Sequence, residues 1–161
     1  MKRARGFTLI ELAAAIGVMA ILASVAVAGG SAALERARAS RAGADIKIVV
    51  ASLRQYQSDV GVFPSAREDL ATRPADAPRW RGPYLERWPQ GLGADSAAAW
   101  SYQRQTWFDG RPAWGLAICS QTDFDPELVA RIDRAGDDGD TATGAIRFAG
   151  NCLRVYVGHD P

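Results

Sequence analysis

The sequence has 161 residues and carries 19 basic and 18 acidic residues, which gives a formal net charge of +1. This balance gives no indication of a nucleic-acid partner or of a polyanionic substrate. The chain has a single histidine and two cysteines, and it contains no phosphate-binding loop and no catalytic metal cluster. The residues needed for catalysis are therefore missing, and an enzyme is not predicted.

Residues 6–30 form one apolar run in which Glu11 is the single charged residue. About 20 residues at roughly 1.5 Å rise each cross the hydrocarbon core of a bilayer, so the run predicts a transmembrane helix. Lys2, Arg3 and Arg5 precede it, and there is no acid among residues 1–6. This charge bias predicts a cytoplasmic N-terminus and an extracytoplasmic globular part.

Glu11 is out of place in such a helix. A carboxylate inside a membrane segment costs on the order of 2.5 to 3.5 kcal/mol unless a partner compensates its charge. No lysine, arginine or histidine lies between Phe7 and Ser31, so the helix offers no cationic side chain of its own. The cation is therefore expected to come from elsewhere.

The basic leader, Gly6 and the run FTLIEL resemble the processing site of type IV pilins and of type II secretion pseudopilins. The resemblance implies that a membrane peptidase cuts between Gly6 and Phe7 and methylates the new amine on Phe7. It also implies that Glu11 of an incoming subunit pairs with the Phe7 amine of a subunit already in the filament. Glu11 is then an assembly residue.

Two other interpretations of the N-terminus remain open. Ala26-Val27-Ala28 followed by Gly29 fits a signal-peptidase site, so residues 1–28 could be a removable secretory signal. The segment could also be a plain single-pass anchor. The apolar run is long for a signal sequence, whose apolar region has about 7 to 15 residues, and neither interpretation explains Glu11.

From Ser31 to Asp59 the polarity changes but the helical period continues. No proline interrupts this stretch, and charged residues occupy the positions between the apolar ones, so a solvated charged face is predicted. The helix is expected to stop near Gly61, before Pro64. The apolar residues recur at spacings near three and four: Leu34, Ala37, Ile46, Val49, Val50, Leu53, Tyr56 and Val60.

The middle of the chain strengthens the resemblance. Residues 53–64, LRQYQSDVGVFP, resemble the helix-to-loop junction of major pseudopilins, and residues 80–85, WRGPYL, resemble their next loop. A short helix is expected over residues 67–71, followed by a loop rich in proline and glycine over residues 74–93. Its aromatic residues are expected to pin this loop onto the core: Trp80, Tyr84 and Trp88.

The second half of the sequence predicts an antiparallel sheet on the long helix. Strands are expected at residues 100–107, 114–119 and 152–157, with a weaker strand at 145–148. Asp109-Gly110 is expected to form a turn. A short helix over residues 128–134, ending near Gly136, is predicted because Asp125, Pro126 and Glu127 supply an N-cap, a first-turn proline and an acid.

Cys119 and Cys152 most simply form one disulfide if the chain is exported to an oxidising compartment. The bond would close a loop of about 34 residues, for which the chain-entropy model gives roughly 3 to 4 kcal/mol. By resemblance, a disulfide loop near the C-terminus is typical of type IV pilins, whereas major pseudopilins carry a calcium loop instead.

Four aspartates near Gly136 could supply oxygen ligands to calcium, although their spacing does not fit an EF-hand loop. Turn residues before a strand are the alternative interpretation of this segment. No other cofactor is predicted. The four residues are Asp133, Asp137, Asp138 and Asp140.

The combined expectation is an α+β, pilin-like lollipop with a long N-terminal helix and a small antiparallel sheet on its outer half. Residues 1–6 would be a cleaved leader, residues 7–30 the transmembrane and filament-core half of the helix, and residues 31–161 the extracytoplasmic head. The resemblance implies a structural subunit of a type II secretion pseudopilus. The alternatives are a type IV pilin, serving adhesion, motility or DNA uptake, and a membrane-anchored binding module.

The partners implied by the resemblance are other pilins or pseudopilins, a prepilin peptidase and an inner-membrane assembly platform. No nucleic-acid partner is indicated. The expected location is the bacterial inner membrane, crossed once, with the head in the periplasm or outside the cell once the filament forms.

Overall fold

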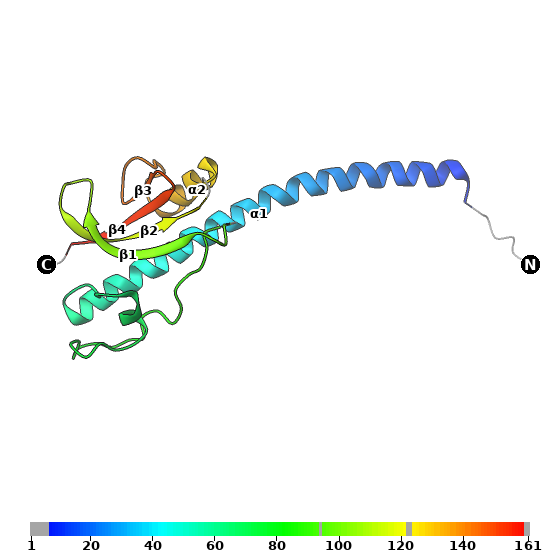
Figure 1. Ribbon diagram of the computed structural model, residues 1–161. Coiled ribbons are helices and arrows are strands. Elements are labelled where there is room, and N and C mark those ends of the chain that lie inside the picture. Colours follow the sequence, from blue (N-terminus) through cyan, green and yellow to red (C-terminus); the bar gives the residue numbers. More distant parts are fainter. Residues whose placement is uncertain (1–6, 94, 122–123, 160–161) are drawn as a thin grey trace, which may run out of the picture. The chain divides into compact units, whose positions relative to one another are not determined.

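The computed structural model describes residues 7–93, 95–121 and 124–159, without the side chains of residues 25–29. The predicted α+β class is confirmed, because a long helix precedes a small sheet whose four strands pair antiparallel (Figure 1). Internal contacts divide the chain into two units, Met1–Arg36 and Ala37–Pro161. The elements are α1 (Leu9–Val60), η1 (Arg67–Leu70), β1 (Ala99–Thr106), β2 (Pro112–Cys119), α2 (Pro126–Gly136), β3 (Ile146–Ala149) and β4 (Cys152–Gly158).

Helix α1 runs for 52 residues without a break because no proline interrupts its period. Thr8 directly precedes its first residue, Leu9, and the Thr8 carbonyl accepts the first helical hydrogen bond from the Leu12 amide. The helix ends where predicted, since Gly61 has a φ of 104°, in a region that favours glycine. The Gly61 amide donates to the Gln57 carbonyl at 2.8 Å and closes the last turn.

In the first unit, α1 presents apolar side chains around its whole circumference. Phe7 and Leu9 are 88% and 87% exposed, and the other large apolar residues up to Leu22 are more than half exposed. Such a surface is normally covered by another protein or by lipid. Across the portion of the chain that is described, no helix has the length and apolar character that a membrane crossing requires.

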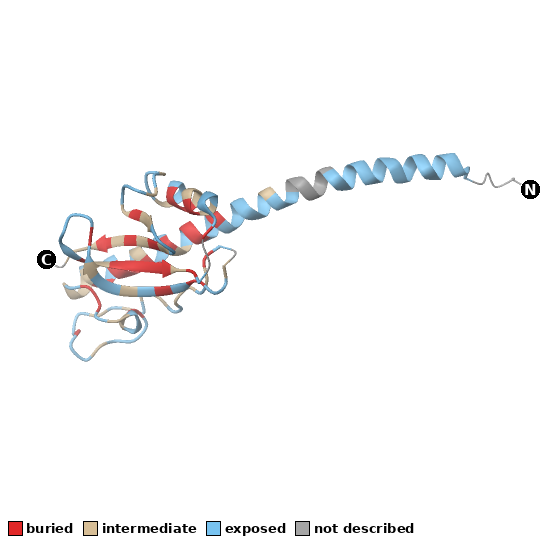
Figure 2. Cartoon of the chain, turned by 45° about the horizontal axis from the view of Figure 1, so that its top comes forward, coloured by how far each residue is buried: buried red, intermediate tan, exposed pale blue. Residues whose placement is uncertain are grey.

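In the second unit, α1 carries a stripe of buried residues at alternating spacings of three and four. Val49 and Leu53 are completely buried in this stripe. The stripe packs on one face of the sheet, where β2 and β4 place Leu116 and Leu153 in the same core. Figure 2 shows the buried positions concentrated in the strands and in the segment of α1 beside them. The stripe comprises Ala39, Ala42, Ile46, Val49, Leu53 and Tyr56.

The four strands lie in the order β1-β2-β4-β3. The β1–β2 hairpin is closed at the predicted turn, where Gly110 has a φ of 76° and its amide donates to the Trp107 carbonyl. In the β2–β4 pair, Cys119 lies directly opposite Cys152, and the two are joined by a disulfide with an S–S distance of 2.05 Å. The bond ties the two central strands together.

The aromatic side chains of the loop after η1 hold it against the core, as predicted. Trp80, Tyr84 and Trp88 are partly buried and pack on the core cluster. The Trp80 indole donates to the Asp69 carbonyl at 2.9 Å, and the Tyr84 hydroxyl donates to the Asp59 carboxylate at 3.0 Å.

Helix α2 begins as the sequence predicts. The Asp125 side chain accepts a hydrogen bond from the Glu127 amide at 2.9 Å, and Pro126 occupies the first turn. The helix buries Val129 and Ile132. It ends at Gly136, as predicted, and begins at Pro126, two residues before the predicted start.

Candidate functional site

The N-terminal end of α1 contains the residues to which the sequence assigns assembly. The described residues begin at Phe7, so Gly6, on the other side of the expected cut, lies outside them. Phe7 and Glu11 are one helical turn apart. Glu11 remains the single charged side chain between Phe7 and Leu34.

Thr8 and Glu11 form a capping box that the sequence analysis missed. The Glu11 carboxylate accepts from the Thr8 amide at 2.9 Å and from the Thr8 hydroxyl at 2.8 Å. In return, the Glu11 amide donates to the Thr8 hydroxyl at 3.3 Å. The pattern T-x-x-E before an apolar run is a signature of this motif and could have revealed it. Glu11 is thus held in place by hydrogen bonds, but its negative charge is not balanced by a cation on this helix.

We predict that Thr8→Val frays the first turn of α1, because valine keeps the shape of threonine but lacks the hydroxyl. Loss of an N-cap side chain costs about 1 kcal/mol. Amide hydrogen exchange at Glu11 and Leu12, measured on the full chain in detergent, should therefore accelerate by roughly fivefold. Thr8→Ser keeps the hydroxyl and serves as the control. Equal exchange rates in Thr8→Val and the parent would contradict the capping role.

Two family models match the chain over the regions that position this site. The model described as "Prokaryotic N-terminal methylation motif" matches residues 1–27, and "Type II secretion system (T2SS), protein G" matches residues 31–96. A curated relative, the type II secretion system core protein G of Xanthomonas campestris pv. campestris, is 32% identical over 84 residues. These matches support a pseudopilin or type IV pilin-like family for this chain.

The match to the Xanthomonas relative covers 50% of this chain and 57% of the relative, so the chain spans little more than half of that protein's length. No solved structure matches the chain. Residues beyond 96 lie outside both family models. The matches favour neither the type IV pilin nor the anchored binding module that the sequence left open.

The acidic segment after α2 lies in the part of the chain that neither family model covers. The structure brings the carboxylates of Asp133, Asp137 and Asp138 within 4.8 Å of one another, whereas Asp140, the fourth predicted ligand, is not in that group. Hydrogen bonds from backbone amides to these carboxylates hold much of the segment in a turn. Asp137 accepts the Ile146 amide at 3.0 Å, and Asp138 accepts the Asp140 amide at 2.9 Å.

Asp133 is different from its neighbours because it is completely buried. It shares the buried face of α2 with Val129 and Ile132, a spacing of three and four that the sequence already contains. Among the residues that the structure describes, neither of its carboxylate oxygens has a hydrogen-bond partner. Burial, followed by the charges of Asp138 and Asp137, raises the pKa of Asp133 from an ordinary 3.8 to about 6.

These residues fit a hard divalent cation such as calcium in one respect. Calcium prefers oxygen ligands, and Asp133 offers two oxygens that are otherwise unsatisfied. Asp137 and Asp138 would complete the carboxylate set. A divalent cation there would offset two of the three adjacent negative charges and so favour the folded turn.

We predict that Asp133→Asn stabilises the full chain at pH 7.5 in the presence of EGTA, because a buried charge is removed. The folded-state pKa lies above the ordinary value, so the ionised residue destabilises the protein progressively as the pH rises from about 4 to about 6. The difference between the two pKa values corresponds to roughly 3 kcal/mol at most, and we expect a gain of about 2 kcal/mol. Urea unfolding of the parent and of Asp133→Asn measures this gain in the free energy of unfolding.

The exposed Asp76→Asn variant is the matched control and should unfold like the parent. Millimolar calcium is expected to raise the melting temperature of the parent and to leave that of Asp133→Asn unchanged. A less stable Asp133→Asn variant in EGTA would mean that the buried carboxylate has a stabilising partner.

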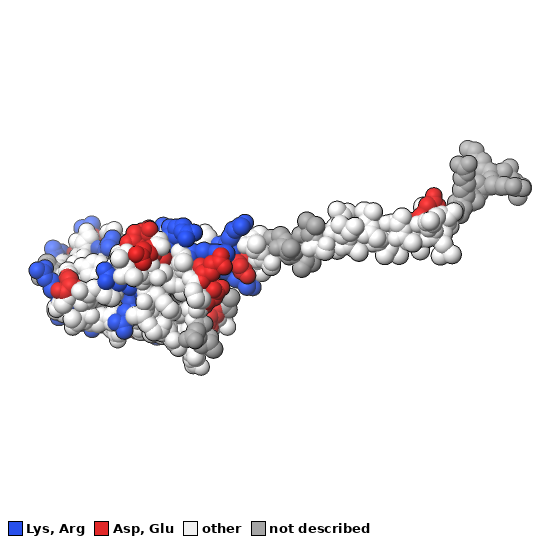
Figure 3. Space-filling view, turned by 90° about the horizontal axis from the view of Figure 1, so that it is seen from above, with Lys and Arg blue, Asp and Glu red and all other residues white. Residues whose placement is uncertain are grey.

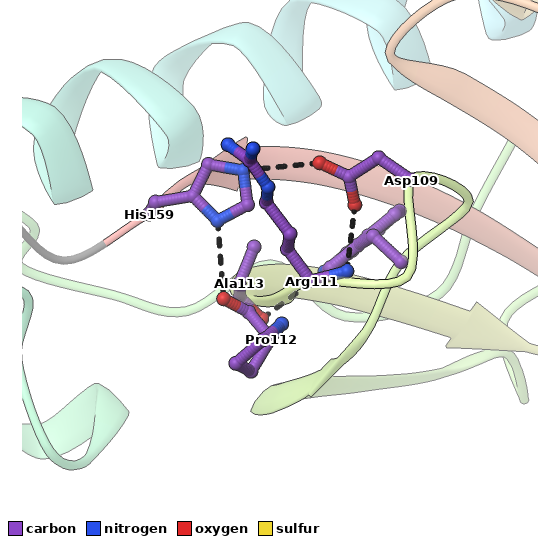
Figure 4. A network of polar contacts seen from close by, with 6 residues as sticks. Asp109, Arg111, Pro112, Ala113 and His159 are labelled. Carbon is purple, nitrogen blue, oxygen red and sulfur yellow. Dashed lines mark hydrogen bonds and ion pairs between the residues drawn. The ribbon is translucent and has the colours of Figure 1, made fainter.

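The single histidine makes a structural contact with the β1–β2 hairpin. His159 Nδ1 lies 3.0 Å from the Pro112 carbonyl, and its Nε2 lies 3.5 Å from the Asp109 carboxylate (Figure 4). The pKa of Asp109 is lowered mainly by the Arg111 amide, which donates to it at 3.0 Å, and to a lesser extent by His159. The network holds the end of β4 against the β1–β2 hairpin.

Proposed function

We propose that this chain is a structural subunit of a type II secretion pseudopilus, built through its N-terminal helix. The observation that carries the proposal is the surface of α1 between Phe7 and Leu22, which is apolar all round and carries one carboxylate. A filament core of packed helices would cover that surface. The family match supports the same role.

In this proposal the prepilin peptidase cuts after Gly6 and methylates Phe7, which creates a cation at the start of the mature chain. Before assembly, the apolar segment anchors the chain in the inner membrane with the basic leader on the cytoplasmic side. Thr8 holds the Glu11 carboxylate at the first turn of the helix.

The pairing of opposite charges then determines the position of each new subunit. In an apolar surrounding, Glu11 of the incoming chain pairs with the Phe7 amine of a chain already in place. An unpaired carboxylate in hydrocarbon is costly, so the register that pairs the charges is favoured over all others. The assembly platform and its motor supply the force for extraction, and the chain itself has a structural rather than a catalytic role.

The test is assembly in cells that contain a type II secretion platform and its peptidase. The full chain is expected to form filaments that can be sheared from the cells and labelled with an antibody under the electron microscope. Removal of the peptidase should abolish them. A processed chain that stays monomeric in the membrane of assembly-competent cells would overturn the proposal.

A further inference from the structure

A groove of about 680 Å³ runs along one flank of α1 in the second unit. Two arginines of α1, Arg38 and Arg41, line it together with Arg87 from the loop that precedes β1. All three side chains are exposed. Over the described residues, none of them makes an ion pair or a hydrogen bond, so their charges are available to a partner.

The groove also has few acceptors of its own. Of the acids that line it, Asp95 already accepts hydrogen bonds from the Ala97 amide and the Ser120 hydroxyl. Asp45 is then the one other acid in the lining, and it faces the positive charges of three guanidinium groups. The indole N–H of Trp88, another lining residue, is buried without an acceptor in the described part of the chain. The groove therefore suits an acidic partner.

The same chain carries such a partner on a second surface. Residues 137–140, which we call the acidic turn, expose three aspartates within four positions: Asp137, Asp138 and Asp140. The Asp140 amide, which donates to Asp138, lowers the pKa of that carboxylate most, and the nearby cation Arg147 helps to lower it. The Arg147 guanidinium also lies 3.7 Å from the centre of the Phe108 ring, and its Nε donates to the Gly144 carbonyl. Figure 3 shows acidic side chains gathered in patches beside basic ones on one face of the molecule.

The groove and the acidic turn lie on roughly opposite flanks of α1. The end of α2, which leads into the acidic turn, rests on α1 near Gly43 and Lys47, where Lys47 donates to the Ala135 carbonyl at 2.6 Å. On α1, the groove is lined by Arg41 and Ile48 among other residues. At 3.6 residues per turn these two sets point about 130° apart around the helix. One molecule therefore cannot bring its own two surfaces together.

We propose that the groove of one subunit binds the acidic turn of a neighbouring copy of this chain. The contact joins two different surfaces, so it is heterologous and repeats without closing, as a helical filament requires. Complementary charge favours this orientation over its reverse. The inference rests on the proposed filament function and adds a specific lateral contact to it.

Charge reversal in full-length chains assembling in cells tests this contact. Arg41→Glu and Asp140→Arg are each expected to lower the yield of sheared filaments at least about tenfold. Combining them in one chain restores the opposite charges and should return the yield to within about twofold of the parent. Arg111→Glu and Asp76→Arg reverse exposed charges elsewhere and should assemble normally.

Cysteine cross-linking tests the same contact directly. Both native cysteines are already bonded to each other, so a new cysteine can only pair with another new one. A chain carrying Arg41→Cys and Asp140→Cys should give a ladder of disulfide-linked oligomers under oxidising conditions. A chain carrying Arg111→Cys and Asp140→Cys should give none.

The outcomes separate this inference from the proposed function. Normal filament yields from the single reversals would overturn the contact while the filament role stands. If the double reversal does not restore the filament yield, the contact is also overturned, because the groove would then bind something other than the acidic turn. The same holds if the chain with Arg41→Cys and Asp140→Cys gives no ladder of oligomers. If the unmodified chain forms no filaments at all, the proposed function fails and the contact fails with it.

Discussion

Replacing Glu11 with alanine is expected to abolish filament assembly while export and processing continue. In the proposed filament, the substitution leaves the Phe7 amine of the neighbouring subunit without its counter-ion in an apolar surrounding. Breaking a buried pair in this way costs roughly 3 to 5 kcal/mol per contact. Filament yield, measured by shearing and immunoblotting, should fall by about a hundredfold or more.

Glu11→Gln separates the charge of this residue from its capping role. Glutamine keeps an oxygen that can accept the hydrogen bonds from Thr8, but it carries no charge. We expect Glu11→Gln to fail in assembly nearly as completely as Glu11→Ala, whereas Glu35→Ala, which removes the next acid along α1, should assemble. Normal filaments from Glu11→Gln would show that the charge does not determine the register.

Replacing Cys119 and Cys152 together with alanine is expected to lower the free energy of unfolding by about 3 to 4 kcal/mol. The two residues are 33 positions apart, and a cross-link over a loop of that length restricts the unfolded chain by about this amount. Replacing both residues avoids a free thiol that would react with other molecules. The loss is a substantial fraction of the stability of a typical domain, which is about 5 to 15 kcal/mol.

Urea unfolding of the full chain in detergent, followed by tryptophan fluorescence, measures this loss. Reduced parent protein provides the matched control and should unfold at the same urea concentration as the double variant. A decrease of less than about 1 kcal/mol in the free energy of unfolding would contradict this prediction. It would mean that the two strands are equally ordered without the bond.

The secondary structure was predictable because its signals are local. The apolar period of α1, the alternating strand residues and the Asp125 N-cap each lie within a few positions of the element they specify. The start of α2 lies two residues before the predicted one, because the exact terminal residue of a helix is the least certain part of a prediction from local pattern.

The details of the site depended on two different kinds of information. The Thr8–Glu11 capping box and the buried position of Asp133 were present in the local spacing but were missed. By contrast, the contact of His159 with Asp109 joins positions far apart in the chain. No local pattern specifies that pairing, because it follows from the strand order of the folded sheet.

The central claim is that the chain is processed and assembled through its N-terminal helix. Intact mass and N-terminal sequencing of the protein recovered from membranes test it most directly. The account predicts a mature chain that begins at Phe7 and carries one methyl group on its amine. A chain that still begins at Met1, or one cut after Ala28, would contradict it.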